Sequence, residues 1–204
     1  MSELQIFDVE QNSPEWDAAR VGVITASCFK DVLAKGEGIT RRKYMLTVLG
    51  QRISGRVFED RYSNAAMERG HRLEEEARQE YRIETGIEVD RVGFMRRGDV
   101  GCSPDGVIGT DGLQEIKTKL HHLHLECILK DRVPPEHRAQ TQGQLWVSGR
   151  EWIDFVSYSP GLPLFVKRIQ RDEEYIATLA AEVAQFLEEL AALQQQISKY
   201  KVAA

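Results

Sequence analysis

Three absences limit what this chain of 204 residues can be. It has three cysteines, Cys28, Cys102 and Cys127, which are far apart and form no Cys-x-x-Cys pair. This argues against a disulfide framework and against a structural zinc or iron–sulfur site. No apolar run approaches the roughly 20 residues needed to span a bilayer. The opening MSELQIFDVEQNSPEW has neither the basic segment nor the apolar core of a secretory signal, so we expect an intracellular protein with no membrane partner.

The sequence also lacks internal repeats, low-complexity segments and linkers rich in proline or glycine. With 42% hydrophobic and 29% charged residues, it has the composition of an ordinary globular protein. The chain is long enough to bury a substantial core. We therefore predict a single domain over residues 1–204.

An excess of positive charge is missing as well, because the net charge is −5 and the pI is about 5.6. The average conceals an asymmetry: residues 41–61 contain six basic and two acidic side chains, whereas the segment from residue 171 onward is acidic. A basic groove within an acidic exterior is compatible with DNA binding, since the local field determines where phosphate binds. The alternative is a helix face that is simply solvated.

Hydrophobic periodicity alternates between helical and strand spacing along the chain and predicts an α/β fold. Helical spacing predicts helices that begin near residues 13 and 25, and further helices over residues 40–54, 63–85, 121–130 and 134–146. A long amphipathic helix closes the chain, because apolar residues from Leu179 to Leu193 recur at helical spacing. Alternating or continuous apolar residues predict strands over residues 87–95, 100–108, 113–118, 152–158 and 164–169. This order predicts a mixed central β-sheet flanked by helices.

One predicted hairpin carries residues suited to metal chemistry. The reversal at residues 109–112 brings Asp105 close to Glu115, and Glu115 and Lys117 share one face of their strand. Two nearby carboxylates repel each other, and a hard cation such as Mg²⁺ relieves this. The backbone carbonyl of Ile116 offers a further oxygen ligand. Lys117 beside a metal could orient a water, help to deprotonate it, or stabilise transition-state charge.

The alternative to a metal site is a surface turn with a chance ion pair, because an acid followed by Glu-x-Lys occurs by chance in many sequences. The surrounding sequence favours the metal site. The motif SPDG…EIK resembles the core of the PD-(D/E)xK nuclease superfamily, and four further motifs resemble the phage lambda-type exonucleases, which are viral recombinase nucleases. These motifs are WDAARVGVITAS (16–27), GHRLE with AR (70–78), AQTQ with LWV (139–147) and RDEEY (171–175). One departure is Thr118-Lys119, where relatives often have a small residue and proline.

The resemblance implies a restriction-endonuclease-like core and a role for each matching residue. Asp105 and Glu115 would be metal ligands, together with the Ile116 carbonyl, and Lys117 would be the catalytic lysine. The remaining implied roles are a further acid at the metal site (Glu74), a residue that orients water or substrate (Gln142), and a pocket for a terminal 5′-phosphate (Arg20, Ser27 and Ser103).

The resemblance also implies an activity and partners. The protein would be a 5′-to-3′ exonuclease that processively degrades one strand of linear double-stranded DNA to mononucleotides and leaves a 3′ overhang. Mg²⁺ would be the cofactor, with Mn²⁺ as a substitute. The enzyme would act as a homotrimeric ring with a single-strand annealing protein, in the cytoplasm of a bacterial cell and encoded by a phage or prophage.

Two other functions are weighed against this one. A sequence-specific or structure-specific endonuclease on the same core would need a segment that reads base edges, and the chain has no spare segment of that kind. A non-catalytic DNA-binding or annealing protein predicts a basic groove with aromatic residues and no paired carboxylates. Asp105, Glu115 and Lys117 argue against it.

Overall fold

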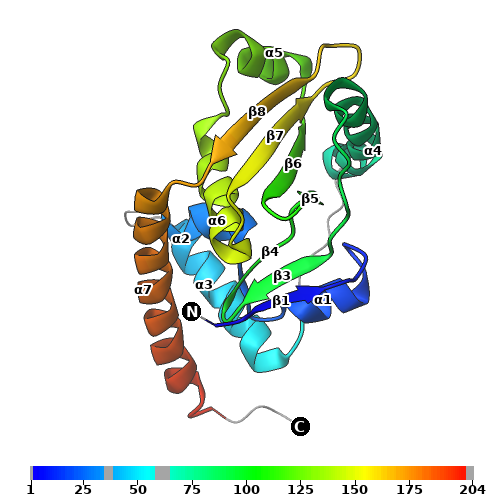
Figure 1. The fold of residues 1–204 in the computed structure, drawn as a ribbon. Helices are drawn as coiled ribbons and strands as arrows, with labels where there is room; N and C mark the ends of the chain where they lie inside the picture. Colours follow the sequence, from blue (N-terminus) through cyan, green and yellow to red (C-terminus); the bar gives the residue numbers. More distant parts are fainter. Residues whose placement is uncertain (1, 35–38, 58–64, 201–204) are drawn as a thin grey trace.

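The computed structural model describes residues 2–34, 39–57 and 65–200 (Figure 1). Its elements follow in the order β1 (Leu4–Phe7), α1 (Pro14–Arg20), β2 (Ile24–Thr25), η1 (Ala26–Cys28), α2 (Phe29–Val32), α3 (Ile39–Ser54), α4 (Ala65–Thr85), β3 (Phe94–Arg97), β4 (Val100–Cys102), β5 (Gly106–Ile108), β6 (Gly112–Thr118), α5 (His121–Lys130), η2 (Pro135–His137), α6 (Arg138–Ser148), β7 (Trp152–Tyr158), β8 (Phe165–Gln170) and α7 (Glu173–Ile197).

The strands form two mixed four-stranded sheets. The first has the order β1-β3-β4-β2, and the second has the order β5-β6-β7-β8. In the second sheet β6 is antiparallel to β5 and parallel to β7, with Glu115 opposite Phe155. The predicted α/β class with mixed sheets and flanking helices is therefore confirmed, although the strands divide between two sheets.

Helices cover both faces of the second sheet (Figure 1). Helix α4 packs on the face that carries Ile116, where Leu73, Ala77 and Tyr81 complete one apolar cluster. Helix α6 covers the opposite face, where its Leu145 contacts Leu113 of β6. Because side chains alternate along a strand, β6 presents Gln114 and Ile116 to α4, and Glu115 to α6.

A larger core joins the first sheet to helices α2, α3, α6 and α7. Helix α7 is amphipathic, and its buried residues recur at helical spacing: Ile176, Leu179, Val183, Phe186 and Leu190. It begins at Asp172, whose carboxylate accepts a hydrogen bond from the Tyr175 amide at 3.0 Å. This packing fixes the start of α7 next to α6.

The predicted strand over residues 100–108 is wrong in one respect. It divides into β4 and β5, which belong to different sheets, and residues 103–105 cross between them. Pro104 has no amide hydrogen to give to a sheet ladder, which is one reason for the break. Strands β1 and β2 are additional to the predicted ones.

Of the predicted basic segment, residues 58–61 lie outside the described part of the chain.

Among the described helices, none has the length and apolar character that a bilayer crossing requires.

Candidate active site

Strand β6 places Glu115 and Lys117 side by side. The Glu115 carboxylate is 2% exposed and forms an ion pair with Lys117, with Nζ 2.5 Å from Oε1. Two glutamines of α6 donate to the same carboxylate, Gln140 to Oε1 and Gln144 to Oε2, each at 2.6 Å. Three donors therefore fix the direction of this buried carboxylate.

Asp105 directly precedes β5, the edge strand of the second sheet, which pairs with β6 only as far as Gln114. Its backbone amide donates to the Gln114 carbonyl at 3.0 Å, and its side-chain Oδ2 accepts from the Ile116 amide at 2.5 Å. The amide and carbonyl of one strand residue point to the same edge. The Ile116 carbonyl therefore points to the edge at which Asp105 lies, as the predicted ligand set requires.

The charges of this cluster act on one another. Burial and the neighbouring Glu115 carboxylate raise the pKa of Asp105 well above its usual range, and Glu74 adds to this rise. Burial alone would lower the pKa of Lys117, but the carboxylates of Glu115 and Asp105 outweigh it and raise that pKa. The cluster thus has more negative charge than one lysine neutralises, which is the condition that favours a bound cation.

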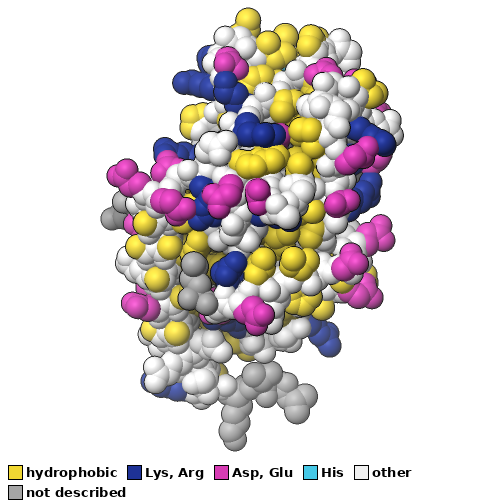
Figure 2. Space-filling view, viewed as in Figure 1, with side chains coloured by type: hydrophobic (Ala, Val, Ile, Leu, Met, Phe, Trp, Pro, Cys, Tyr) yellow, Lys and Arg dark blue, Asp and Glu magenta, His cyan; other side chains and the backbone are white. Residues whose placement is uncertain are grey.

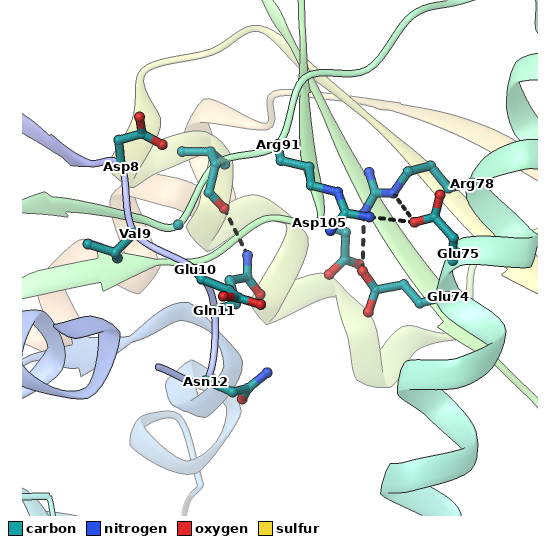
Figure 3. Close-up of a pocket in the computed structure, with 12 residues that line it drawn as sticks. Asp8, Val9, Glu10, Gln11, Asn12, Glu74, Glu75, Arg78, Arg91 and Asp105 are labelled. Atoms are coloured by element: carbon teal, nitrogen blue, oxygen red, sulfur yellow. Dashed lines mark hydrogen bonds and ion pairs between the residues drawn. The ribbon is translucent and has the colours of Figure 1, made fainter. Parts of the chain in front are cut away.

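Glu74 of α4 borders a cleft of about 510 Å³ that Asp105 also lines. Figure 3 shows the carboxylates of Glu74 and Asp105 on the same side of this cleft. Arg78, one helical turn along α4, donates to Glu74 Oε1 at 3.1 Å and to Gln114 at 3.3 Å. Arg78 thereby ties the helix to β6 and holds Glu74 at the cleft.

The cleft is acidic, because five of its lining residues carry carboxylates: Asp8, Glu10, Glu74, Glu75 and Asp105. Two arginines, Arg78 and Arg91, offset part of this charge, and both approach Glu75. The surplus of oxygen donors over cations suits a hard divalent metal.

The residues at this site fit Mg²⁺ in the open manner that this ion prefers. Within the described ranges, no three His, Cys, Asp or Glu side chains form a ready-made cage. Mg²⁺ commonly uses one or two carboxylates and takes its other ligands from water and substrate phosphate. Asp105, Glu115 and the Ile116 carbonyl are all hard oxygen donors, so the donor set matches the ion.

The three residues predicted to hold a 5′-phosphate lie in two places. The Arg20 guanidinium stacks on Trp16 at 3.7 Å from the ring centroid, and the Trp16 indole donates to Ser103 Oγ at 2.8 Å. Trp16 thus connects Arg20 to Ser103, two residues before Asp105. Ser27 is exposed in η1 and lines a second pocket that contains Lys117.

The structure does not bring Gln142 to this cluster. Its side chain accepts from the Asp172 amide and donates to the Gln170 carbonyl, both at 2.9 Å, and so joins α6 to the start of α7. Residues two apart on a helix point in nearly opposite directions, whereas residues four apart share a face. Gln140 and Gln144 therefore contact Glu115, and Gln142 points away.

Charged segments that were expected to face different directions partly neutralise each other. Arg41 of the basic segment forms a bidentate ion pair with Glu189 of α7, at 2.6 and 2.9 Å. Arg52 is similarly occupied by Asp99 and by the Gly22 carbonyl. On the face drawn in Figure 2, acidic and basic side chains are interspersed. The exposed basic side chains left in the described part of this segment are Arg42, Lys43 and Arg56.

Two histidines have structural roles that the sequence motifs do not indicate. His124 is buried, with Nδ1 2.8 Å from Ser157 Oγ and Nε2 2.9 Å from the Pro163 carbonyl oxygen. His137 lies beside the active site, where the Lys119 ammonium donates to its Nε2 at 3.0 Å. Neither role has a clear signal in the sequence, where His124 lies between two leucines and His137 lies between Glu136 and Arg138.

Known proteins provide an independent comparison. Residues 15–151, more than half of the chain, match the model of the YqaJ-like viral recombinase domain. A search of curated proteins finds no significant match.

Solved structures give closer matches. The fold superposes with a TM-score of 0.84 on an alkaline exonuclease (LHK-Exo) from Laribacter hongkongensis, with 40% identity over 92% of this chain and 97% of that one. The same protein in complex with dAMP gives a TM-score of 0.84 and 41% identity over the same shares. A phage-related exonuclease from Haemophilus somnus 129PT shares the fold, with a TM-score of 0.63 and 16% identity over 87% of this chain and 96% of that one.

The matched domain contains Asp105, Glu115 and Lys117, and it extends from α1 to the end of α6. The resemblance to the viral recombinase nucleases, first indicated by short motifs, is thereby confirmed over most of the chain. This protein belongs to the YqaJ-like viral recombinase family.

Proposed function

We propose that this protein is a divalent-metal-dependent exonuclease that hydrolyses phosphodiester bonds of linear double-stranded DNA from the 5′ end. One observation carries the proposal. The Asp105 carboxylate accepts a hydrogen bond from the amide of Ile116, which stands between Glu115 and Lys117. The carboxylates of Asp105 and Glu115, the Ile116 carbonyl and the Lys117 ammonium therefore lie close together at β6. The family match and the 40% identity to a protein described as an alkaline exonuclease support the same activity.

The chain's own residues have separable tasks in this proposal. Asp105, Glu115 and the Ile116 carbonyl would hold Mg²⁺, or Mn²⁺ in its place. The ion, when bound, would act as a Lewis acid toward water and the scissile phosphate. Gln140 and Gln144 fix the Glu115 carboxylate through their 2.6 Å hydrogen bonds.

Lys117 supplies positive charge where the phosphate oxygens become more negative in the transition state. Its ion pair with the buried Glu115 aligns it before substrate binds. Glu74, held by Arg78 at the acidic cleft, adds a carboxylate for a water-mediated or direct role beside Asp105.

End recognition would use Arg20, Ser27 and Ser103. A guanidinium presents a fork that suits phosphate, and hydroxyls add hydrogen-bond donors. The stacking of Arg20 on Trp16, and the hydrogen bond from Trp16 to Ser103, support a joint role for Arg20 and Ser103. The products would be mononucleotides and a 3′ single-stranded overhang.

We further propose a closed ring of three subunits around the DNA, acting with a single-strand annealing protein in phage-type recombination inside the bacterial cell. Closed cyclic symmetry keeps the enzyme on its substrate without any extra domain. Light scattering should give the trimer mass, and digestion should continue after excess competitor DNA is added. A monomer whose digestion stops at once on adding competitor would refute the ring.

The decisive test of the activity is digestion of linear duplex labelled at one 5′ or 3′ end, with Mg²⁺ or with EDTA. We expect mononucleotides from the 5′ end in Mg²⁺ and intact DNA in EDTA. Lys117→Ala should abolish turnover while thermal melting stays close to that of the wild type, and Lys199→Ala, an exposed lysine beyond α7, serves as the matched control. Discrete fragments would indicate an endonuclease, and near-normal turnover in Lys117→Ala would exclude the mechanism.

A further inference from the structure

A second, smaller pocket opens on the α6 side of β6. It has a volume of about 200 Å³ and lies between α2, β6 and the η2–α6 turn. Its lining residues are Ser27, Lys30, Lys117, Glu136, His137 and Gln140. Two of them, Lys117 and Gln140, also contact Glu115, so the pocket adjoins the candidate active site.

The pocket is basic, in contrast to the cleft beside Asp105. Its lining residues include two lysines, Lys30 and Lys117, and one acid, Glu136, whose side chain is 62% exposed and therefore screened by water. Glu115, which pairs with Lys117, is not among the lining residues. Lys119 is not a lining residue, but its ammonium lies next to the pocket because it donates to His137 Nε2 at 3.0 Å. The His137 ring is itself fixed against Phe155, with the ring centroids 5.1 Å apart.

His137 remains a neutral acceptor in this setting. Burial, together with the positive charges of Lys119 and Lys117, lowers the pKa of His137 to about 4. At neutral pH the ring accepts a hydrogen bond from Lys119 and contributes no charge of its own. The positive charge that faces the pocket therefore comes from the lysines.

The size and chemistry of the pocket identify the class of ligand. Its volume is below the roughly 300–1,000 Å³ typical of sites that enclose a whole small molecule. Two ammonium groups, a hydroxyl and an amide instead match a single phosphate group, which carries negative charge and several acceptor oxygens. A DNA strand that reaches the Asp105–Glu115 edge passes this pocket, because Lys117 belongs to both.

We propose that this pocket binds a phosphate group of the DNA strand being cut, that Lys30 is a binding residue for this phosphate, and that His137 positions Lys119 beside the pocket. This rests on the proposed nuclease function. Ser27 belongs to the pocket, whereas Arg20 and Ser103 are not among its lining residues. Lys30 would therefore add a phosphate contact that the predicted set of Arg20, Ser27 and Ser103 does not include.

The experiment compares Lys30→Ala and Lys30→Arg with the control Lys199→Ala. Steady-state digestion is measured on linear duplexes that carry either a 5′-phosphate or a 5′-hydroxyl. We expect Lys30→Ala to raise KM several-fold with little change in kcat, and Lys30→Arg to restore most of the loss, because either cation can contact phosphate. A KM increase on both substrates assigns the pocket to an internal phosphodiester, and an increase confined to the phosphorylated one assigns it to the terminal phosphate.

A binding measurement in EDTA separates this proposal from the nuclease proposal. Fluorescence anisotropy of the same two duplexes is followed as salt increases. Losing one phosphate contact should reduce the log–log slope of affinity against salt by about 0.7–0.9 in Lys30→Ala. If Lys30→Ala matches Lys199→Ala in KM and in salt slope, the proposal is overturned. A wild-type protein that binds DNA but does not cut it would contradict the nuclease function. The salt dependence of binding in Lys30→Ala would still show whether the pocket binds phosphate.

Discussion

Two glutamines on α6 should affect different properties when they are replaced: Gln140 the turnover and Gln142 the stability. Comparing the two variants tests the placement of the candidate active site directly. Gln140 donates to the Glu115 carboxylate at 2.6 Å. A hydrogen bond to a charged group contributes about 1.5–3 kcal/mol. If Gln140→Ala loses this energy in the transition state alone, kcat falls by roughly 10- to 150-fold. The stability of the fold should change little, because Gln144 and Lys117 still hold Glu115.

Gln142→Ala should instead affect stability. The Gln142 side chain is buried, and its amide satisfies the Asp172 amide and the Gln170 carbonyl. Each of these two hydrogen bonds contributes about 1 kcal/mol, so the variant should be destabilised by about 2 kcal/mol. For a chain of this size that corresponds to a Tm roughly 4–8 °C lower. Turnover per folded molecule should remain close to that of the wild type.

Both variants are compared with Gln79→Ala, which removes an exposed glutamine from helix α4. Thermal melting and initial rates of nucleotide release are measured on the same protein samples, at a temperature below the lowest Tm. The reasoning is refuted if Gln142→Ala loses turnover at an unchanged Tm while Gln140→Ala digests DNA normally. That result would mean that the second glutamine of the AQTQ motif reaches the substrate in the active enzyme.

Three further predictions follow from the charges. In EDTA at pH 7–8, Asp105→Asn should raise the Tm. Burial and the Glu115 carboxylate raise the pKa of Asp105, so the folded state binds the Asp105 proton more tightly than the unfolded chain does. The stability of the wild type should therefore fall as the pH rises from about 4 toward that raised pKa. Melting curves against pH would contradict this if stability rose across that window. Arg41→Ala breaks a partly exposed bidentate pair with Glu189, so denaturant titration should show a loss of about 1 kcal/mol while DNA affinity stays unchanged. Arg20→Ala should reduce digestion more on 5′-phosphorylated than on 5′-hydroxyl ends; an equal loss on both would mean that Arg20 acts only through its packing on Trp16.

Much of the fold follows from periodicity, and the exceptions have identifiable causes. The residue ranges predicted for α5 and β7, 121–130 and 152–158, agree with the structure. Strands β1 and β2 have four and two residues, and their pairing depends on β3 and β4, about 75 to 90 positions later in the chain. Local sequence holds little information about such pairing. Pro104, in contrast, was an available signal for the break between β4 and β5.

The candidate site was predictable to the extent that strand geometry defines it. Alternation along β6 places Glu115 and Lys117 on one face, and the turn places Asp105 at the edge. The glutamines were harder to assign, because residues 141–145 of helix α6 are all buried and polar residues occur on every side of this part of the helix. Without a contrast between a polar and an apolar face, periodicity does not indicate which glutamine meets the sheet. The equal spacing of Gln140 and Gln144, four residues apart, was the remaining clue.

The alternation of β6 also explains why the two pockets differ in charge. Helix α4 covers the Gln114 and Ile116 face and brings Glu74 to the acidic cleft, whereas α6 covers the Glu115 face and brings Gln140 to the basic pocket. The acidic cleft and the basic pocket therefore lie on opposite faces of β6, whereas the ion-paired Glu115 and Lys117 share the α6 face. In the proposed function, a metal is favoured at the edge where Asp105 and Glu115 come together, and a phosphate in the basic pocket. A phosphodiester lying across that edge would contact both sides at once, so the orientation of the DNA strand would be fixed by the packing of α4 and α6 on opposite faces of the sheet.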